Sequence, residues 1–157
     1  GERAGRTYEA LPVGTVIEHQ RTHRITEPAD RHFCELTDNT QPFHLDATAG
    51  EAAGFEGILV NGLYTMTVAV GLSVPETTEE TIIANLGYDN VEHPRPVSIG
   101  DELYARTEVI ARRHTSDEER GIVTMHIDTH RTQADATPDP AEDPVVCRFD
   151  RTALFPL

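Results

Sequence analysis

The hydrophobic positions in the first half of the chain predict helices that follow one opening strand. That strand is expected over 15–25. Thr26 then stands as an N-cap before a proline in the first turn, and apolar residues recur after it at helical spacing. This helix is predicted to stop between 37 and 42, and a short alanine-rich helix follows at about 47–53. A third helix begins near Gly62 and is apolar almost all round, which indicates that it is buried.

The second half is a run of strand patterns, in which apolar and β-branched residues partly alternate with polar ones. The polar stretches 98–101 and 115–121 supply turns. The acidic stretch 133–143 carries two prolines and is predicted as a solvated hairpin loop rather than a domain boundary. The four predicted strands span 82–93, 102–112, 121–132 and 145–154. The pattern therefore predicts an α+β fold, with one domain over 1–157 in which a curved antiparallel sheet wraps around a buried central helix.

The composition makes this domain strongly acidic. The chain has 157 residues, of which 27 are acidic and 13 basic, and the formal net charge is -14. Every one of the basic residues is arginine, and lysine is absent. Such a surface opposes binding to nucleic acids and to anionic membranes. It is typical of a protein that works in concentrated salt, where the Debye length falls to roughly 3 Å at 1 M. The alternative is a GC-rich genome, whose codon bias replaces lysine by arginine.

The sequence contains no pattern typical of a membrane span or a secretory leader. The longest mostly apolar stretch, 58–74, is broken by polar residues and is shorter than the roughly 20 residues that a bilayer span needs. The first residues carry charge without the apolar core of a signal peptide. We therefore expect a cytoplasmic protein in which Cys34 and Cys147 need not be paired, with Cys34 as a small core residue.

The densest polar cluster lies at 36–46, in the turn after the capped helix. A proline-stiffened bend between a carboxylate or amide and a histidine can place two polar side chains opposite each other over one small site. By spacing alone, caps and surface groups explain these residues at least as well. His126 and His130, with Asp128 between them, could chelate a metal, but we expect this strand face to be turned to solvent. No metal site is therefore predicted.

Three blocks of sequence occur in a fixed order along the chain. They are TDNTQPFHLD at 37–46, then Phe55 and NGL at 61–63, and PVSIGDEL at 96–103. In this order the blocks resemble the MaoC-like dehydratases, the (R)-specific enoyl-CoA hydratases of hot-dog fold. The resemblance covers most of the chain. It implies reversible addition of water across the 2,3 double bond of an enoyl-CoA thioester.

The resemblance also assigns roles to residues. His44, with the side chain at 38 or 39, would hold the water, remove its proton and deliver a proton to C2. Gly62 would offer its N–H to the thioester oxygen, although close helix packing also explains a glycine there. The family's acid is replaced by Asn39, and the glycine that usually precedes it is Asp38. Three explanations are open: Asp38 takes over as the acid, which we favour; Asn39 is an engineered substitution that traps substrate; or the protein is a binding or weakly active relative.

The same resemblance sets expectations for substrate and partners. CoA is part of the substrate, so no separate cofactor is expected. Our preferred substrate is mesaconyl-CoA, with Arg95 as the cationic partner of its free carboxylate, ahead of straight-chain enoyl-CoA. Asn61, in the place of a family histidine, is a second candidate substrate-binding residue. A non-catalytic acyl-CoA-binding domain and a thioesterase are the alternatives. The open sheet edge of this fold predicts a homodimer or a higher homo-oligomer.

Overall fold

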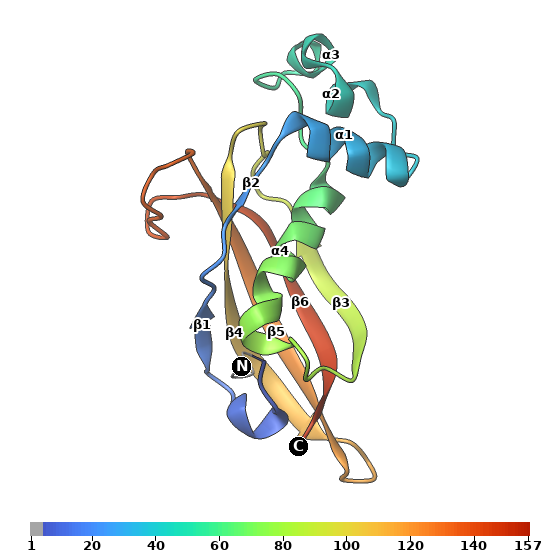
Figure 1. Cartoon of the computed structure of the whole chain (residues 1–157), viewed down its shortest axis with the longest axis vertical. Helices are drawn as coiled ribbons and strands as arrows, with labels where there is room; N and C mark the ends of the chain where they lie inside the picture. Colours follow the sequence, from blue (N-terminus) through green and yellow to red (C-terminus); the bar gives the residue numbers. More distant parts are fainter. Residues whose placement is uncertain (1–4) are drawn as a thin grey trace.

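The computed structural model describes residues 5–157, which form one six-stranded antiparallel sheet with a long helix packed against it (Figure 1). The strands follow the order β1-β4-β5-β6-β3, and β2 also pairs with β4. The strands are β1 (Val16–Glu18), β2 (His23–Arg24), β3 (Ala84–Glu92), β4 (Glu102–His114), β5 (Arg120–Thr132) and β6 (Val145–Pro156). The helices are η1 (Tyr8–Ala10), α1 (Glu27–Leu36), α2 (Pro42–Leu45), α3 (Ala47–Ala52) and α4 (Gly62–Thr77).

The central helix α4 crosses one face of the sheet and contacts β4 and β6 (Figure 1). Side chains along each strand alternate between this inner face and the outer face of the sheet. On β5, Val123, Met125 and Ile127 are buried, whereas Thr124 and His126 between them are half-buried on the opposite face. The alternation read from the sequence therefore sets which face meets the helix, and the predicted α+β architecture is confirmed.

The helices α1, α2 and α3, the short helices of the site, gather at the end of the molecule where α4 begins (Figure 1). Thr26 caps α1 as predicted, because its hydroxyl accepts a hydrogen bond from the Ala29 N–H at 3.4 Å. Asp46 ends α2 and caps α3, and its carboxylate accepts from the N–H groups of Thr48 and Ala49. The sequence did not predict α2, which is a single turn. It carries His44.

Two of the predicted elements are wrong in detail. The opening strand over 15–25 is interrupted between β1 and β2, where His19 keeps a backbone bond to Ala105 of β4 and contacts with the central helix are added. The Gln20 N–H donates to one Glu76 carboxylate oxygen at 2.9 Å, and His19 Nδ1 lies 3.1 Å from the other. The second error concerns α4, which was expected to be buried because it is apolar almost all round. One of its sides is uncovered in this single chain, where Leu63 is 58% exposed.

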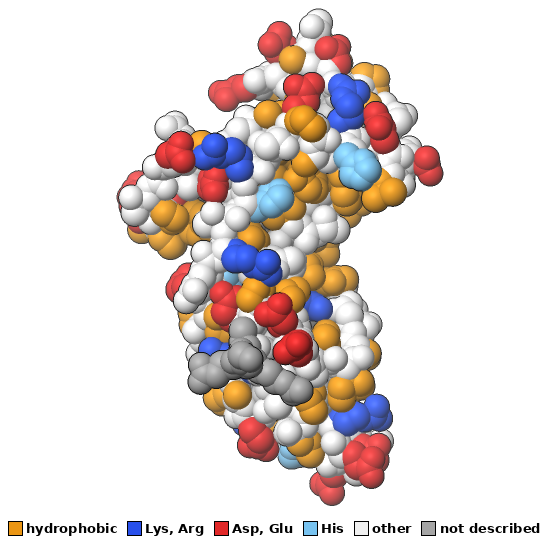
Figure 2. All heavy atoms as spheres, in the orientation of Figure 1, with side chains coloured by type: hydrophobic (Ala, Val, Ile, Leu, Met, Phe, Trp, Pro, Cys, Tyr) orange, Lys and Arg blue, Asp and Glu red, His pale blue; other side chains and the backbone are white. Residues whose placement is uncertain are grey.

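The surface carries the acidity that the composition predicts. Acidic side chains are spread over the whole visible face rather than gathered in one patch (Figure 2). Both cysteines are free and buried, as expected. Among residues 5–157, no helix is long and apolar enough to cross a membrane.

Candidate active site

A cavity of about 290 Å³ lies where the short helices meet the start of α4. It brings together three of the residues singled out in the sequence, His44, Gly62 and Arg95, and adds His93. Its other walls are mainly apolar, formed by Phe55, Leu59, Val60, Thr65, Pro94, Pro96, Val97 and Val146. An apolar pocket with a few converging polar groups is the usual form of a small-molecule site.

His44 is held in one tautomer by its surroundings. Pro42 starts the single turn α2, and His44 near its end is 9% exposed. Its Nδ1 lies 2.7 Å from the carbonyl oxygen of Leu59. Because a carbonyl only accepts hydrogen bonds, Nδ1 carries the proton and donates it. In the neutral ring, Nε2 is therefore left as a proton acceptor, which is the form that a general base requires.

The N-terminus of α4 leaves one amide free beside this histidine. The Asn61 N–H donates to Asp30 at 3.0 Å, and the Leu63 N–H donates to the Asn61 side chain at 3.0 Å. Gly62 lies between these two committed amides, and its own N–H has no partner within residues 5–157. A helix N-terminus also favours negative charge. The Gly62 amide is thus available to a carbonyl oxygen that enters the cavity.

Asp30 supports this helix start and was missed in the sequence. It is 1% exposed, and one of its carboxylate oxygens accepts from the Asn61 N–H. The other oxygen is buried without a hydrogen-bond partner in the described part of the chain. Burial raises the pKa of Asp30, while the bond from Asn61 and attraction to His44 act in the opposite direction. The available signal was an acidic residue one turn before Cys34, on the buried stripe of α1.

The candidate acids of the motif lie outside the lining of this cavity. Asp38 is exposed, just past the end of α1, and adopts φ of 61°. That conformation favours glycine, the residue the family usually has there. Asn39 is half-buried, and its side-chain oxygen accepts from the Gln41 N–H at 3.4 Å. The placement of Asp38 gives it a turn-forming role and does not support our preference for it as the acid.

His93 covers the glycine at the start of α4. A β-carbon placed on Gly62 would lie 3.2 Å from Cε1, 3.3 Å from Nδ1 and 3.4 Å from Nε2 of this ring. Because these three distances are nearly equal, the ring covers Gly62 with its face, on the side of Cε1 and the two nitrogens. Partial burial lowers the pKa of His93, although the residue as a whole is exposed to solvent. Arg95 follows two residues later, is exposed, and forms no ion pair within residues 5–157.

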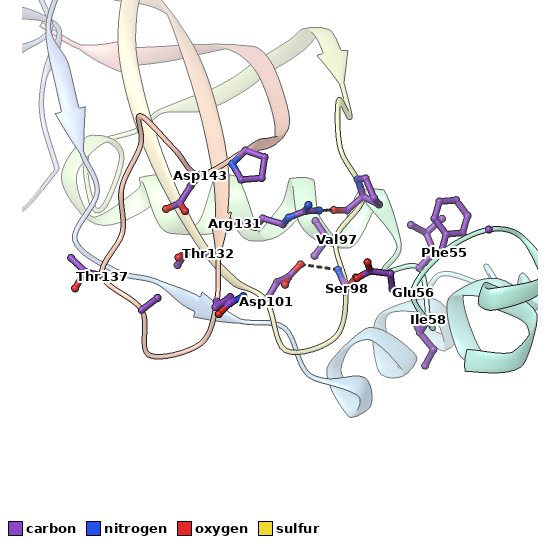
Figure 3. A pocket seen from close by; sticks show the side chains of 16 residues that line it. Phe55, Glu56, Ile58, Val97, Ser98, Asp101, Arg131, Thr132, Thr137 and Asp143 are labelled. Carbon is purple, nitrogen blue, oxygen red and sulfur yellow. Dashed lines mark hydrogen bonds between the residues drawn. The ribbon is translucent and has the colours of Figure 1, made fainter.

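A second, larger cavity of about 750 Å³ adjoins the first and shares four of its wall residues, Phe55, Leu59, Pro96 and Val97. Figure 3 shows this outer cavity, where Asp101 accepts from the Ser98 N–H at 2.9 Å. The Arg131 guanidinium points to the Pro96 carbonyl and donates to it. Glu56 and Asp143 also line the cavity. Burial raises the pKa of Asp101. The outer cavity does not contain His44, so we place the chemistry in the smaller one.

The histidines of β5 do not converge. A register shift between Thr129 and His130 turns His130 inward, where its ring stacks on Tyr104 at 5.2 Å. His126 stays on the outer face, with Nδ1 2.7 Å from Asp150 and Nε2 3.0 Å from Asp128. Within residues 5–157, no group of three histidine, cysteine or acidic side chains is arranged to hold a metal ion.

The antiparallel sheet, the central helix and the cavity at its N-terminus define a hot-dog domain. Residues 9–131 match the family model described as "MaoC like domain". The chain therefore belongs to the MaoC-like family of enoyl-CoA hydratases and dehydratases.

The chain is also similar to three known proteins. A MaoC-like dehydratase from Rhodospirillum rubrum is 28% identical with a TM-score of 0.81, and the match covers 97% of each chain. A Mycobacterium tuberculosis protein described as having a double hot-dog fold is 25% identical with a TM-score of 0.81, over 98% of this chain and 44% of that one. Mesaconyl-CoA hydratase from Haloarcula hispanica is 26% identical over 121 residues, which are 76% of this chain and 34% of that protein. This chain thus spans about a third of the length of this curated relative.

Proposed function

We propose that this chain catalyses the reversible hydration of a 2-enoyl-CoA thioester. The observation that carries the proposal is the pair formed by a histidine with a free basic nitrogen and an uncommitted helix amide on one cavity wall. Membership of the MaoC-like family supports a hydratase or dehydratase chemistry.

The pair is suited to both halves of the addition. His44 Nε2 accepts a proton from water as the water oxygen bonds to C3. The electrons of the 2,3 double bond then shift toward the thioester oxygen, where the Gly62 N–H stabilises the developing charge. The proton on His44 passes to C2, which completes the addition without a second acid. Positioned proton transfer contributes about 100- to 10,000-fold, and one donor to the oxyanion about 3–4 kcal/mol.

Arg95 supports a dicarboxylic substrate. A free carboxylate on the acyl group needs a cationic partner in an apolar pocket, and Arg95 lines the pocket without an ion pair among the described residues. The Haloarcula hispanica relative is named mesaconyl-CoA hydratase. We therefore prefer mesaconyl-CoA, which carries such a carboxylate, over straight-chain enoyl-CoA. Arg95→Ala should raise KM for mesaconyl-CoA and leave KM for crotonyl-CoA unchanged.

Loss of the enoyl-thioester absorbance tests the activity directly. The wild type is compared with His44→Gln, which removes the base, and with His32→Gln as a matched control, because His32 is exposed on α1 away from the cavity. We expect His44→Gln to lower kcat by about 100-fold or more and His32→Gln to leave it unchanged. Equal activity of the His44→Gln variant would refute the proposed base.

Asn39 favours a second candidate function, a non-catalytic acyl-CoA-binding domain. An amide can hold a water but cannot take its proton. Under this alternative, the wild type binds acyl-CoA and hydrates none of the enoyl-CoA substrates. Isothermal titration with a saturated acyl-CoA, run beside the absorbance assay, distinguishes the two functions.

We further propose that a second hot-dog unit covers the edge strand β3. Several large apolar side chains on or just before this strand are exposed: Ile83, Leu86, Tyr88 and Val91. Exposed apolar residues in a row on a sheet edge are a docking surface. The second unit is either another copy of this chain or another domain of a longer protein. Sedimentation of wild type against Leu86→Asp tests the first arrangement, and we expect the variant to dissociate.

A further inference from the structure

Beyond the pair of His44 and Gly62, His93 is placed to act on the substrate. It follows β3 directly and lines the cavity, and its ring lies over Gly62 at the start of α4. Neither the motif blocks nor the spacing of the sequence singled it out. We propose that His93 is a second hydrogen-bond donor to the thioester oxygen, beside the Gly62 amide. This inference rests on the proposed hydratase function.

The geometry of the ring carries the proposal. The part of the ring face that carries both nitrogens lies over Gly62, with Nδ1 and Nε2 3.3 Å and 3.4 Å from the position of an added β-carbon. Both ring nitrogens are therefore close to Gly62, in the same cavity as His44. Within residues 5–157, neither ring nitrogen of His93 forms a hydrogen bond to the protein. The ring can therefore present its N–H to the substrate without breaking a bond.

Electrostatics favour the neutral ring in this position. Burial lowers the pKa of His93, so the imidazole is uncharged near neutral pH. The positive end of the α4 dipole acts in the same direction, since it disfavours an imidazolium. A neutral imidazole still has one N–H and can polarise a carbonyl, as neutral histidines do in other active sites. His93 then acts only as a hydrogen-bond donor, and His44 alone moves protons.

This donor gives Gly62 a second physical reason to be glycine. A β-carbon at position 62 would lie 3.2–3.4 Å from the His93 ring, so the ring would have to shift by a few tenths of an ångström. Two donors on one oxyanion are the usual form of such a site, and each is preorganised before charge develops.

Replacing the ring by one without a donor tests the proposal. His93→Phe keeps the ring and removes the N–H, His93→Gln keeps an N–H donor, and His32→Phe on the exposed face of α1 is the matched control. We expect His93→Phe to lower kcat by about 100- to 1,000-fold with KM changed less than a few-fold, because the bond strengthens in the transition state. His93→Gln should recover at least about a tenth of the wild-type kcat, and the control should match the wild type. A His93→Phe variant within twofold of the wild-type kcat overturns the inference.

A second measurement separates this inference from the proposed function. The carbonyl stretch of a saturated acyl-CoA, carbon-13 labelled at the thioester, is recorded by infrared difference spectroscopy on the bound complexes. Loss of a donor should move the stretch to higher frequency in His93→Phe and by less in His93→Gln. This readout needs binding but no turnover, so it remains decisive if the wild type hydrates nothing. An unchanged stretch in both variants overturns the role of His93, whereas a wild type without hydratase activity overturns only the proposed function.

Discussion

Asn61→Ala removes the side chain that fixes the start of α4. Asn61 is 2% exposed, and its side-chain oxygen accepts the Leu63 N–H at 3.0 Å. Its amide group also donates to the Cys34 sulfur at 3.6 Å. Alanine leaves the Leu63 amide without this acceptor. The backbone bond from residue 61 to Asp30 remains, so the variant isolates the side-chain cap.

The size of the effect follows from these contacts. Loss of an N-cap costs about 1 kcal/mol, in a range of about 0.5–2. The buried position adds a small void and a lost sulfur contact, so we expect a loss of about 1–2 kcal/mol. For a chain of this length, each kcal/mol lowers Tm by about 2–4 °C, which gives a decrease of about 2–8 °C. The freed first turn also lets the Gly62 amide reorient, and kcat should fall together with stability.

Urea unfolding and thermal melting measure the change, and Asn61→Ser is the matched variant. Serine keeps an oxygen acceptor for the Leu63 amide and removes the contact with Cys34. It ranks with asparagine as a cap. We expect it to restore more than half of the lost stability. If the serine and alanine variants are equally destabilised, the cap is not what Asn61 contributes, and the account of the α4 start is wrong.

Three further predictions concern the motif, the pH and the salt. Asn39→Asp restores a carboxylate at the family's acid position. This variant should raise kcat about tenfold or more in the absorbance assay. An unchanged kcat would show that position 39 takes no part in proton transfer. Burial lowers the pKa of His19 in the folded chain. As pH falls below about 6.5, His19 is therefore protonated in the unfolded chain before it is protonated in the folded one, and the folded state loses stability. Urea titrations from pH 8 to 5 should show this loss in the wild type and a smaller one in His19→Gln; equal losses contradict the assignment. Rising KCl should raise Tm and lower KM for the acyl-CoA, whereas a Tm that does not climb with salt excludes adaptation to concentrated salt.

The fold was predictable because most of its signals are local. Alternation within single strands, the Thr26 cap and the apolar run after Gly62 each depend on neighbours in the sequence. The break between β1 and β2 depends on Glu76, which lies more than fifty positions further along the chain. No periodicity reports such a contact. The uncovered side of α4 was missed for a related reason. A hydrophobic pattern shows that a residue is apolar, but it does not show which part of which molecule covers that residue.

The residues of the site also divide into those that local sequence predicts and those that depend on contacts between distant elements. The motif predicted His44 and Gly62, and the structure brings both to one cavity. The motif could not show that Asp38 adopts a left-handed conformation outside that cavity, because backbone conformation at a helix end is set by the turn that follows. Asp30 and His93 were missed because their roles arise from packing against Asn61 and Gly62, which come from other elements.

The negative charge of the chain opposes the binding of CoA, and the arginines near the site offset this repulsion only in part. CoA carries phosphates, while the chain has a net charge of -14. Among the described residues, several arginines are bound in ion pairs away from the cavities: Arg24, Arg31, Arg106, Arg120 and Arg148. Arg95 lines the smaller cavity and Arg131 the outer one, where Glu56, Asp101 and Asp143 are also part of the lining. The arginines of the cavity walls therefore do not offset the repulsion between the acidic chain and the CoA phosphates. Screening by salt must reduce the repulsion that is left. Salt thus acts on substrate binding and on folding through the same charges, which is why we expect KM and Tm to respond to KCl together.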